Sequence, residues 1–220
     1  MNLTPLLVAG TAFFLLKAFM GSSAGTGLPT PKRLYVLGDS QIANGVFSKK
    51  LRSKTSTEII NGGTGGYGIR QLRKEWLPDL LSHQPDMVLL WAGVNDIASK
   101  RGAKYVKEQI ELLRDEVHPA PLVVFEIPPW GGYHKYGPEL KFDETNRSNA
   151  LLHTIEGITV IPTGTLGTNG ILDPENTYIR RATGLPEGLH FGSKGYNKIV
   201  DIATAHIPLL PLPKGMGILR

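Results

Sequence analysis

The 220-residue chain contains no cysteine. This absence excludes disulfide bonds, thiolate metal sites and a cysteine nucleophile, although it does not identify the cellular compartment. A nucleophile must therefore be a residue of another type. Charged residues make up 20% of the chain, close to ordinary globular usage, and the basic residues behind the net charge of +5 are scattered along the sequence. Scattered basic residues are typical of solvated helix faces, so nucleic acid is not an expected partner.

Hydrophobic residues make up 41% of the chain, which is ordinary for a globular protein. Without its N-terminal segment the chain keeps about 190 residues, enough for one domain with a full hydrophobic core. We expect a hydrophobic segment at 1–25, a linker at 26–32, a single domain at 33–207 and a tail rich in proline and glycine at 208–220.

The N-terminal segment is apolar from Pro5 to Gly25 except for Lys17 and small hydroxyl residues. Ser22 and Ala24 are spaced like a signal-peptide cleavage site, but no Lys or Arg precedes the apolar run. A membrane anchor formed by a helix around Leu6 to Met20 fits better, and an amphipathic helix docked on the domain or on a partner is the alternative. The segment predicts a membrane-anchored or exported protein without deciding which side of the membrane the domain faces.

Beyond residue 33, short apolar runs alternate with segments of helical periodicity. Several runs, such as MVLLWAG and LVVFEIP, are almost continuously apolar, as is typical of parallel strands covered on both faces. The sequence therefore predicts an α/β fold: a single, doubly wound, mostly parallel five-stranded sheet with helices on both sides, a flavodoxin-like α/β/α sandwich. The expected strands are Leu34–Leu37, Glu58–Ile60, Met87–Trp91, Leu122–Ile127 and Ile158–Ile161.

In such a sheet the functional crevice lies at the carboxyl ends of the strands. The five segments that follow the expected strands are rich in glycine and polar residues: GDSQ, NGGTGGYG, AGVND, PPWGGYHKYG and a long loop that runs to EGLHFGSKGY. The first strand ends abruptly at Ser40, which would expose its hydroxyl at the sheet edge. A helix beginning near Gln41 would bring free backbone amides to the same place.

Three further residues come in order at later strand ends. Asn95 offers a side-chain amide, and His190 offers a base that a serine nucleophile needs, with the acidic Glu187 three residues before it. Asp39 and Asp96 flank the candidate residues, and we expect each to brace its own turn. Asp173 is expected in a turn and is the alternative acid.

Four of these segments resemble the four sequence blocks of the SGNH hydrolases, also called GDSL-type esterases and lipases. The resemblance covers most of residues 33–207 through GDSQ, NGGTGGYG, GVND and EGLH. Two positions depart from the family pattern. Gln41 stands where members often have leucine, a change we expect to be without chemical effect, and Glu187 stands where they usually have aspartate.

The resemblance implies that Ser40 is a nucleophile activated by His190, with Glu187 orienting the imidazole. It also implies an oxyanion hole made of the Ser40 amide, the Gly66 amide and the Asn95 side chain. No metal and no cofactor are implied.

Substrate signals are few. Trp130, Tyr133 and Tyr136 in the loop after the fourth strand are candidates for binding a sugar ring or an acyl chain, or for packing the loop onto the domain. No long insertion suggests a lid, so a small acyl group on a carbohydrate is the leading expectation. An O-acyltransferase that uses the same site, and a non-catalytic, membrane-tethered or assembly-associated binding module on the same fold, are the alternatives. The oligomeric state is not predicted.

Overall fold

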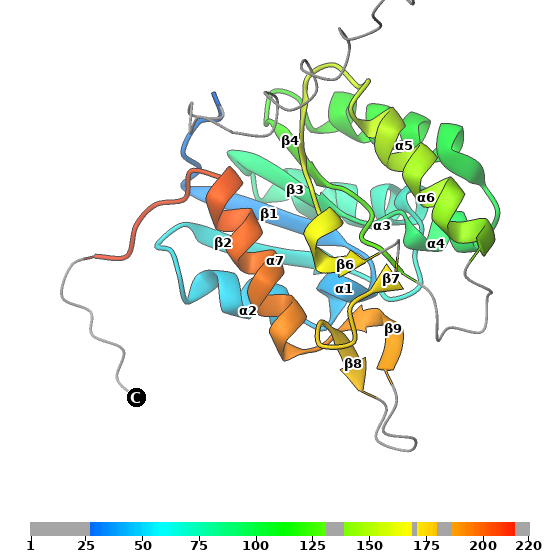
Figure 1. The fold of residues 1–220 in the computed structure, drawn as a ribbon. Coiled ribbons are helices and arrows are strands. Elements are labelled where there is room, and N and C mark those ends of the chain that lie inside the picture. The colour runs from blue at the N-terminus through cyan, green and yellow to red at the C-terminus, as the bar shows by residue number, and fades with distance from the viewer. Residues whose placement is uncertain (1–26, 131–138, 169–170, 180–185, 214–220) are drawn as a thin grey trace, which may run out of the picture.

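A computed structural model describes residues 27–130, 139–168, 171–179 and 186–213 of the protein (Figure 1). The predicted anchor helix around Leu6 to Met20, the aromatic residues Tyr133 and Tyr136 and most of the C-terminal tail lie outside these ranges. The anchor therefore stays a prediction. Within the described ranges, none of the helices has the length and apolar character needed to span a membrane.

The domain is built on a five-stranded sheet in the order β2-β1-β3-β4-β5, with every neighbouring pair parallel. The strands are β1 (Arg33–Gly38), β2 (Glu58–Gly63), β3 (Met87–Trp91), β4 (Leu122–Phe125) and β5 (Ile158–Ile161). The predicted α/β fold is confirmed, and so are the five predicted strands to within a few residues at their ends. β4 is shorter than predicted, since it ends at Phe125 instead of Ile127.

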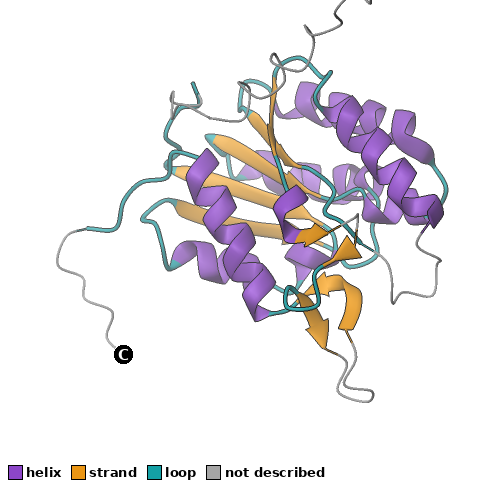
Figure 2. Ribbon diagram, viewed as in Figure 1, coloured by secondary structure: helices purple, strands orange, loops and turns teal. Residues whose placement is uncertain are grey.

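Helices cover both faces of the sheet (Figures 1 and 2). They are α1 (Ser40–Ala43), α2 (Val46–Arg52), α3 (Ile69–Ser82), α4 (Val94–Ala98), α5 (Gly102–Val117), α6 (Glu139–Leu152) and α7 (Ser193–His206), with a 3-10 turn at Gly164–Leu166. Alternate residues of β1 enter different cores, because successive side chains of a strand point to opposite faces. Leu34 and Val36 pack in the cluster that includes residues of α2 and α7, whereas Tyr35 and Leu37 pack in the cluster that includes residues of α3 and α5.

The segment after β5 differs from the long loop that the sequence predicts. It contains two small antiparallel ribbons, β6 (Gly167–Thr168) with β7 (Ile171–Leu172), and β8 (Thr177–Ile179) with β9 (Pro186–Phe191). β6, β7 and β8 have only two or three residues, too few to show an alternating pattern, so no sequence signal predicts them. β9 matters for the site, because His190 lies on this strand and not in a loop.

Candidate active site

Ser40 begins α1 directly after β1, in a turn formed by Gly38 and Asp39. A Cβ on Gly38 would lie 2.4 Å from Ile42 Cγ1 and 2.5 Å from the Trp91 carbonyl oxygen, so any side chain there would clash. Asp39 then caps α1, because its Oδ1 accepts a hydrogen bond from the Gln41 backbone N–H at 3.1 Å. The turn therefore presents Ser40 at the carboxyl end of β1, as the sequence predicts.

Ser40, His190 and Glu187 form a hydrogen-bonded chain. His190 Nε2 lies 2.9 Å from Ser40 Oγ, and His190 Nδ1 lies 2.9 Å from each carboxylate oxygen of Glu187. Glu187 Oε2 also accepts from the backbone N–H of His190 at 2.7 Å. Glu187 thus reaches the imidazole despite its extra methylene, since Gly188 between them adopts φ +79°, a left-handed conformation that favours glycine.

The surroundings of His190 favour its protonated form. Its hydrogen bond to Glu187 raises the pKa of His190, and the charges of Glu187 and Asp39 act in the same direction, while partial burial opposes them. The imidazole is therefore a stronger base than a free histidine side chain, and it remains partly open to solvent with 38% of its side chain exposed. A group of this kind can accept the proton of the neighbouring hydroxyl.

The glycine-rich segment after β2 lies opposite His190. Gly65 and Gly66 line the same cleft as Ser40, Asn95 and His190, and Gly66 adopts φ +81°. Asn95, on α4, lines the cleft as well. Its Nδ2 donates to the Tyr67 carbonyl oxygen at 3.0 Å and lies 3.4 Å from Asp39 Oδ2. A side-chain amide nitrogen carries two N–H groups, so the second one has only the long contact with Asp39.

Two buried carboxylates lie behind the cleft. Burial raises the pKa of Asp39 to about 7, which the Gln41 backbone hydrogen bond and the charge of His190 only partly offset. Burial likewise raises the pKa of Asp96. Asp39 braces its own turn, as expected. Asp96 contacts more than its own turn: its Oδ2 accepts from the backbone N–H of Ile69 at 2.9 Å and so holds the first turn of α3.

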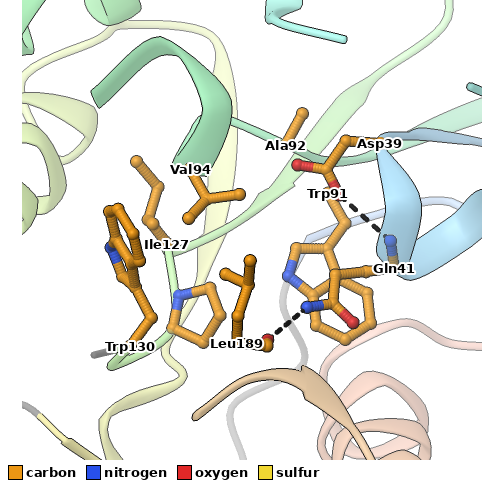
Figure 3. A pocket seen from close by; sticks show the side chains of 9 residues that line it. Asp39, Gln41, Trp91, Ala92, Val94, Ile127, Trp130 and Leu189 are labelled. Carbon is orange, nitrogen blue, oxygen red and sulfur yellow. Dashed lines mark hydrogen bonds between the residues drawn. The ribbon is translucent and has the colours of Figure 1, made fainter. Parts of the chain in front are cut away.

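Gln41 is the residue at this site whose contacts the sequence analysis missed. We expected its side chain to be without effect, yet it is buried and its Nε2 donates to the Leu189 carbonyl oxygen at 2.7 Å, next to His190 (Figure 3). The signal in the sequence was the polarity itself: a glutamine where a leucine is usual needs partners if it is buried.

The cleft that Ser40, Asn95 and His190 line has a volume of about 480 Å³ and is open to solvent. Three of its lining residues, Val94, Trp130 and Leu189, also line a small inner cavity of about 10 Å³ (Figure 3). A cavity of that volume holds about one water-sized group. The other residues around it are Asp39, Gln41, Trp91, Ala92, Ile127 and Pro128.

Two further predicted residues, Trp130 and Asp173, lie within the described ranges. Trp130 lines the cleft but is 3% exposed, and its Nε1 donates to Thr145 Oγ1 at 3.0 Å, so it packs into the domain instead of offering an open aromatic face. Asp173 lies in a turn, where its carbonyl accepts from the Asn176 N–H at 2.9 Å. Within the described ranges, no group of three or more His, Asp or Glu side chains could hold a metal ion.

Comparison with known proteins identifies the family of the chain. Residues 19–198 match the model of the GDSL-like lipase/acylhydrolase family, so the chain belongs to that family. No curated protein matches the chain.

Several solved structures share the fold. A GDSL-like lipase from Bacteroides thetaiotaomicron is 18% identical with a TM-score of 0.62, over 79% of this chain and 86% of that one. A lipase/acylhydrolase from Enterococcus faecalis is 17% identical with a TM-score of 0.59, over 78% and 93%. The acetyl xylan esterase AlAXEase is 18% identical with a TM-score of 0.56, over 78% and 97%.

Proposed function

We propose that the protein is a serine ester hydrolase that removes small acyl groups from a carbohydrate or a similar alcohol. The observation that carries the proposal is the chain from Ser40 Oγ to His190 Nε2 and from His190 Nδ1 to Glu187, with 2.9 Å at each step. Nucleophile, base and orienting acid within hydrogen-bond reach are what acyl transfer through a covalent intermediate needs.

In the first step Ser40 Oγ attacks the carbonyl carbon of the ester while its proton passes to His190 Nε2. The tetrahedral intermediate collapses as the C–O bond to the alcohol breaks and the alcohol oxygen takes the proton from Nε2. Water then attacks the acyl-serine while one of its protons passes to His190 Nε2. The second tetrahedral intermediate collapses as the bond from the acyl carbon to Ser40 Oγ breaks, Oγ takes the proton from Nε2, and the carboxylic acid leaves. Glu187 holds the ring in place and stabilises the imidazolium that forms in both halves.

The negative oxygen of each tetrahedral intermediate needs donors. We assign this role to the backbone amides of Ser40 and Gly66 and to the second N–H of Asn95, whose 3.4 Å contact with Asp39 is weak and costs little to exchange. One such donor typically contributes about a hundredfold or more to the rate.

The preference for a small acyl group is supported by the wall between the cleft and the inner cavity. Val94, Trp130 and Leu189 border both spaces, so an acyl chain bound to Ser40 meets these side chains instead of a tunnel. The fold similarity to an acetyl xylan esterase suggests an acetylated sugar as the first substrate to try. Transfer of the acyl group to a sugar hydroxyl would need the same residues, with the hydroxyl in place of water.

We favour catalysis over a non-catalytic binding module, because Glu187 reaches the imidazole with both carboxylate oxygens.

The test is turnover of a p-nitrophenyl ester series and of an acetylated xylo-oligosaccharide. We expect hydrolysis of the acetyl esters, labelling of Ser40 by a fluorophosphonate probe, and loss of both in Ser40→Ala. Labelling at a different serine, or an unchanged rate in Ser40→Ala, would refute the proposal. Acetyl transfer to an added sugar in preference to water would identify an acyltransferase.

A further inference from the structure

Gln41 pairs with the edge of the strand that carries His190. Its side chain is 3% exposed, its Nε2 donates to the Leu189 carbonyl oxygen at 2.7 Å, and its Oε1 lies 3.4 Å from the Phe191 backbone nitrogen as acceptor. In an extended strand the C=O of one residue and the N–H two residues later point to the same edge. The amide of Gln41 therefore meets the backbone groups on either side of His190 as a neighbouring strand would.

A tyrosine fixes the backbone of the same residue. The Tyr196 hydroxyl donates to the Gln41 backbone carbonyl oxygen at 2.9 Å, lies 3.4 Å from Gln41 Oε1, and accepts from Asn44 Nδ2 at 2.7 Å. Tyr196 is itself buried, at 2% exposure. Gln41 is thus held at its backbone by Tyr196, while Leu189 and Phe191 set the orientation of its side-chain amide.

The opposite edge of β9 is held as well. Thr177 Oγ1 donates to the His190 carbonyl oxygen at 3.0 Å and accepts from the Gly188 N–H at 2.8 Å. His190 therefore lies on a short strand with a side chain bonded to each edge. Of these two side chains, only Gln41 belongs to the turn that carries Ser40.

We propose that Gln41 is a positioning residue that fixes His190 Nε2 within hydrogen-bond distance of Ser40 Oγ; this inference rests on the proposed function. Ser40 and Gln41 are neighbours in α1, so a single turn carries both the nucleophile and the group that holds the strand of the base. Misplacement of a reacting group by about 1 Å can cost on the order of a hundredfold in rate. A leucine at this position would leave the Leu189 carbonyl without the donor it has here.

The experiment replaces Gln41 by methionine, which has a similar length and shape but neither bonds Leu189 nor Phe191. With p-nitrophenyl acetate we expect kcat of Gln41→Met to fall about tenfold or more, with KM within about threefold of the wild type. The acidic pKa of the kcat/KM profile should not move, because the contacts between His190 and Glu187 are untouched. The Phe191 amide should exchange its hydrogen faster than in the wild type.

Gln109→Met is the matched control. Gln109 is a buried glutamine on α5, 7% exposed, and its Oε1 accepts from Arg73 Nη1 at 2.8 Å. The same chemical change there removes one buried hydrogen bond outside the cleft, so kcat should stay within about twofold of the wild type at a temperature where both variants are folded.

Tyr196→Phe is a second, milder variant in case Gln41→Met does not fold. It removes the hydroxyl that orients Gln41, and we expect a smaller fall in kcat with KM unchanged. The proposal is overturned if folded Gln41→Met, or Tyr196→Phe when the first variant is unfolded, keeps the kcat of the wild type.

An inactive wild type would refute the proposed function and, with it, the catalytic part of this inference. Hydrogen exchange separates the two failures. Faster exchange of the Phe191 amide in Gln41→Met would still show that Gln41 holds the strand, whereas unchanged exchange would overturn that as well.

Discussion

Glu187 replaces the aspartate that is usual in this family, and the structure shows how a longer side chain serves the same histidine. Its two oxygens lie 2.9 Å from His190 Nδ1, and one of them also binds the His190 backbone N–H. The carboxylate folds back along β9 to do so. A glutamine at this position would keep an oxygen that accepts from Nδ1–H but would lose the negative charge.

We therefore expect Glu187→Gln to lower kcat far less than His190→Ala. Loss of the imidazole abolishes proton transfer, which is usually worth about a hundred- to ten-thousandfold, whereas loss of the charge removes only stabilisation of the imidazolium. Initial rates on p-nitrophenyl acetate measure both variants. Equal losses would make Glu187 indispensable, and an unchanged rate in Glu187→Gln would place the acid elsewhere, with Asp173 the next to test.

The same variant has a pH signature. Glu187 raises the pKa of His190, and the reaction needs the neutral imidazole, so the wild type loses activity on the acidic side at a higher pH than an ordinary histidine would dictate. Glu187→Gln removes the main cause, and the acidic limb of its kcat/KM profile should move to lower pH. A limb that moves up or stays in place would contradict this account of the His190 pKa.

At the scale of elements, β9 and α4 together form the wall that limits the cleft. Leu189 comes from β9 and Val94 from α4, and both residues line the open cleft as well as the small inner cavity, so we infer that they lie between the two. Asp96, two residues after Val94, binds the first turn of α3, so α4 is tied to the glycine-rich segment that precedes that helix.

Leu189→Ala should join the inner cavity to the cleft and let longer acyl chains bind. Burial of one methylene contributes about 0.8 kcal/mol, so two more buried methylenes correspond to roughly a 15-fold gain. We expect the ratio of kcat/KM for p-nitrophenyl butyrate to that for the acetate to rise by about tenfold over the wild type. Leu81→Ala on α3, where the side chain is 48% exposed, is the control and should leave the ratio unchanged. A wild type that already prefers butyrate, or an unchanged ratio in Leu189→Ala, would refute the role of the wall.

At the scale of the whole molecule, the site lies at one end of the sheet, and the residues that lead into β1 lie at the other (Figure 1). Asp86 accepts hydrogen bonds from the backbone N–H groups of Lys32 and Arg33 at 2.9 and 2.8 Å, which fixes the chain where β1 begins. Ser40 follows the other end of β1, about 20 Å away for a strand of six residues. The segment after α7 also reaches the end of the sheet where β1 begins, because the Ser56 N–H, just before β2, donates to the Leu210 carbonyl oxygen at 3.0 Å.

The stability of the whole domain should depend on pH through Asp39. Its pKa is raised to about 7, so the folded protein holds this proton to a higher pH than the unfolded chain does. The contribution of Asp39 to stability is therefore present at low pH and is lost as the pH rises through about 7.

Asparagine at position 39 stays neutral at every pH. The melting temperature of Asp39→Asn relative to the wild type should consequently rise between pH 5 and pH 8.5, by on the order of 5 °C. Thermal unfolding followed by circular dichroism at the two pH values measures this. The difference in melting temperature at pH 5 is the baseline, because it contains the effect of the altered hydrogen bonds to Gln41 and Asn95. If the difference is the same at both pH values, the raised pKa of Asp39 is contradicted.

The sequence by itself determined the sheet and most of the site. Apolar runs with helical segments between them predict five parallel strands, since a strand covered on both faces must be apolar throughout, and the polar residues at the ends of those runs must then meet at one edge. Ser40, Asn95 and His190 could be placed together on this ground, and the family resemblance followed from the same short motifs.

Tertiary structure decided what depends on contacts between segments far apart in the chain. Only the fold shows that Glu187 reaches the imidazole, since that depends on the turn at Gly188, and that Gln41 binds β9, about 150 residues further along. Trp130 offered an aromatic ring in the sequence, and the packing of the domain buried it. Local patterns record the periodicity of one segment, whereas the partners of a buried polar side chain are set by whichever segment the fold brings against it.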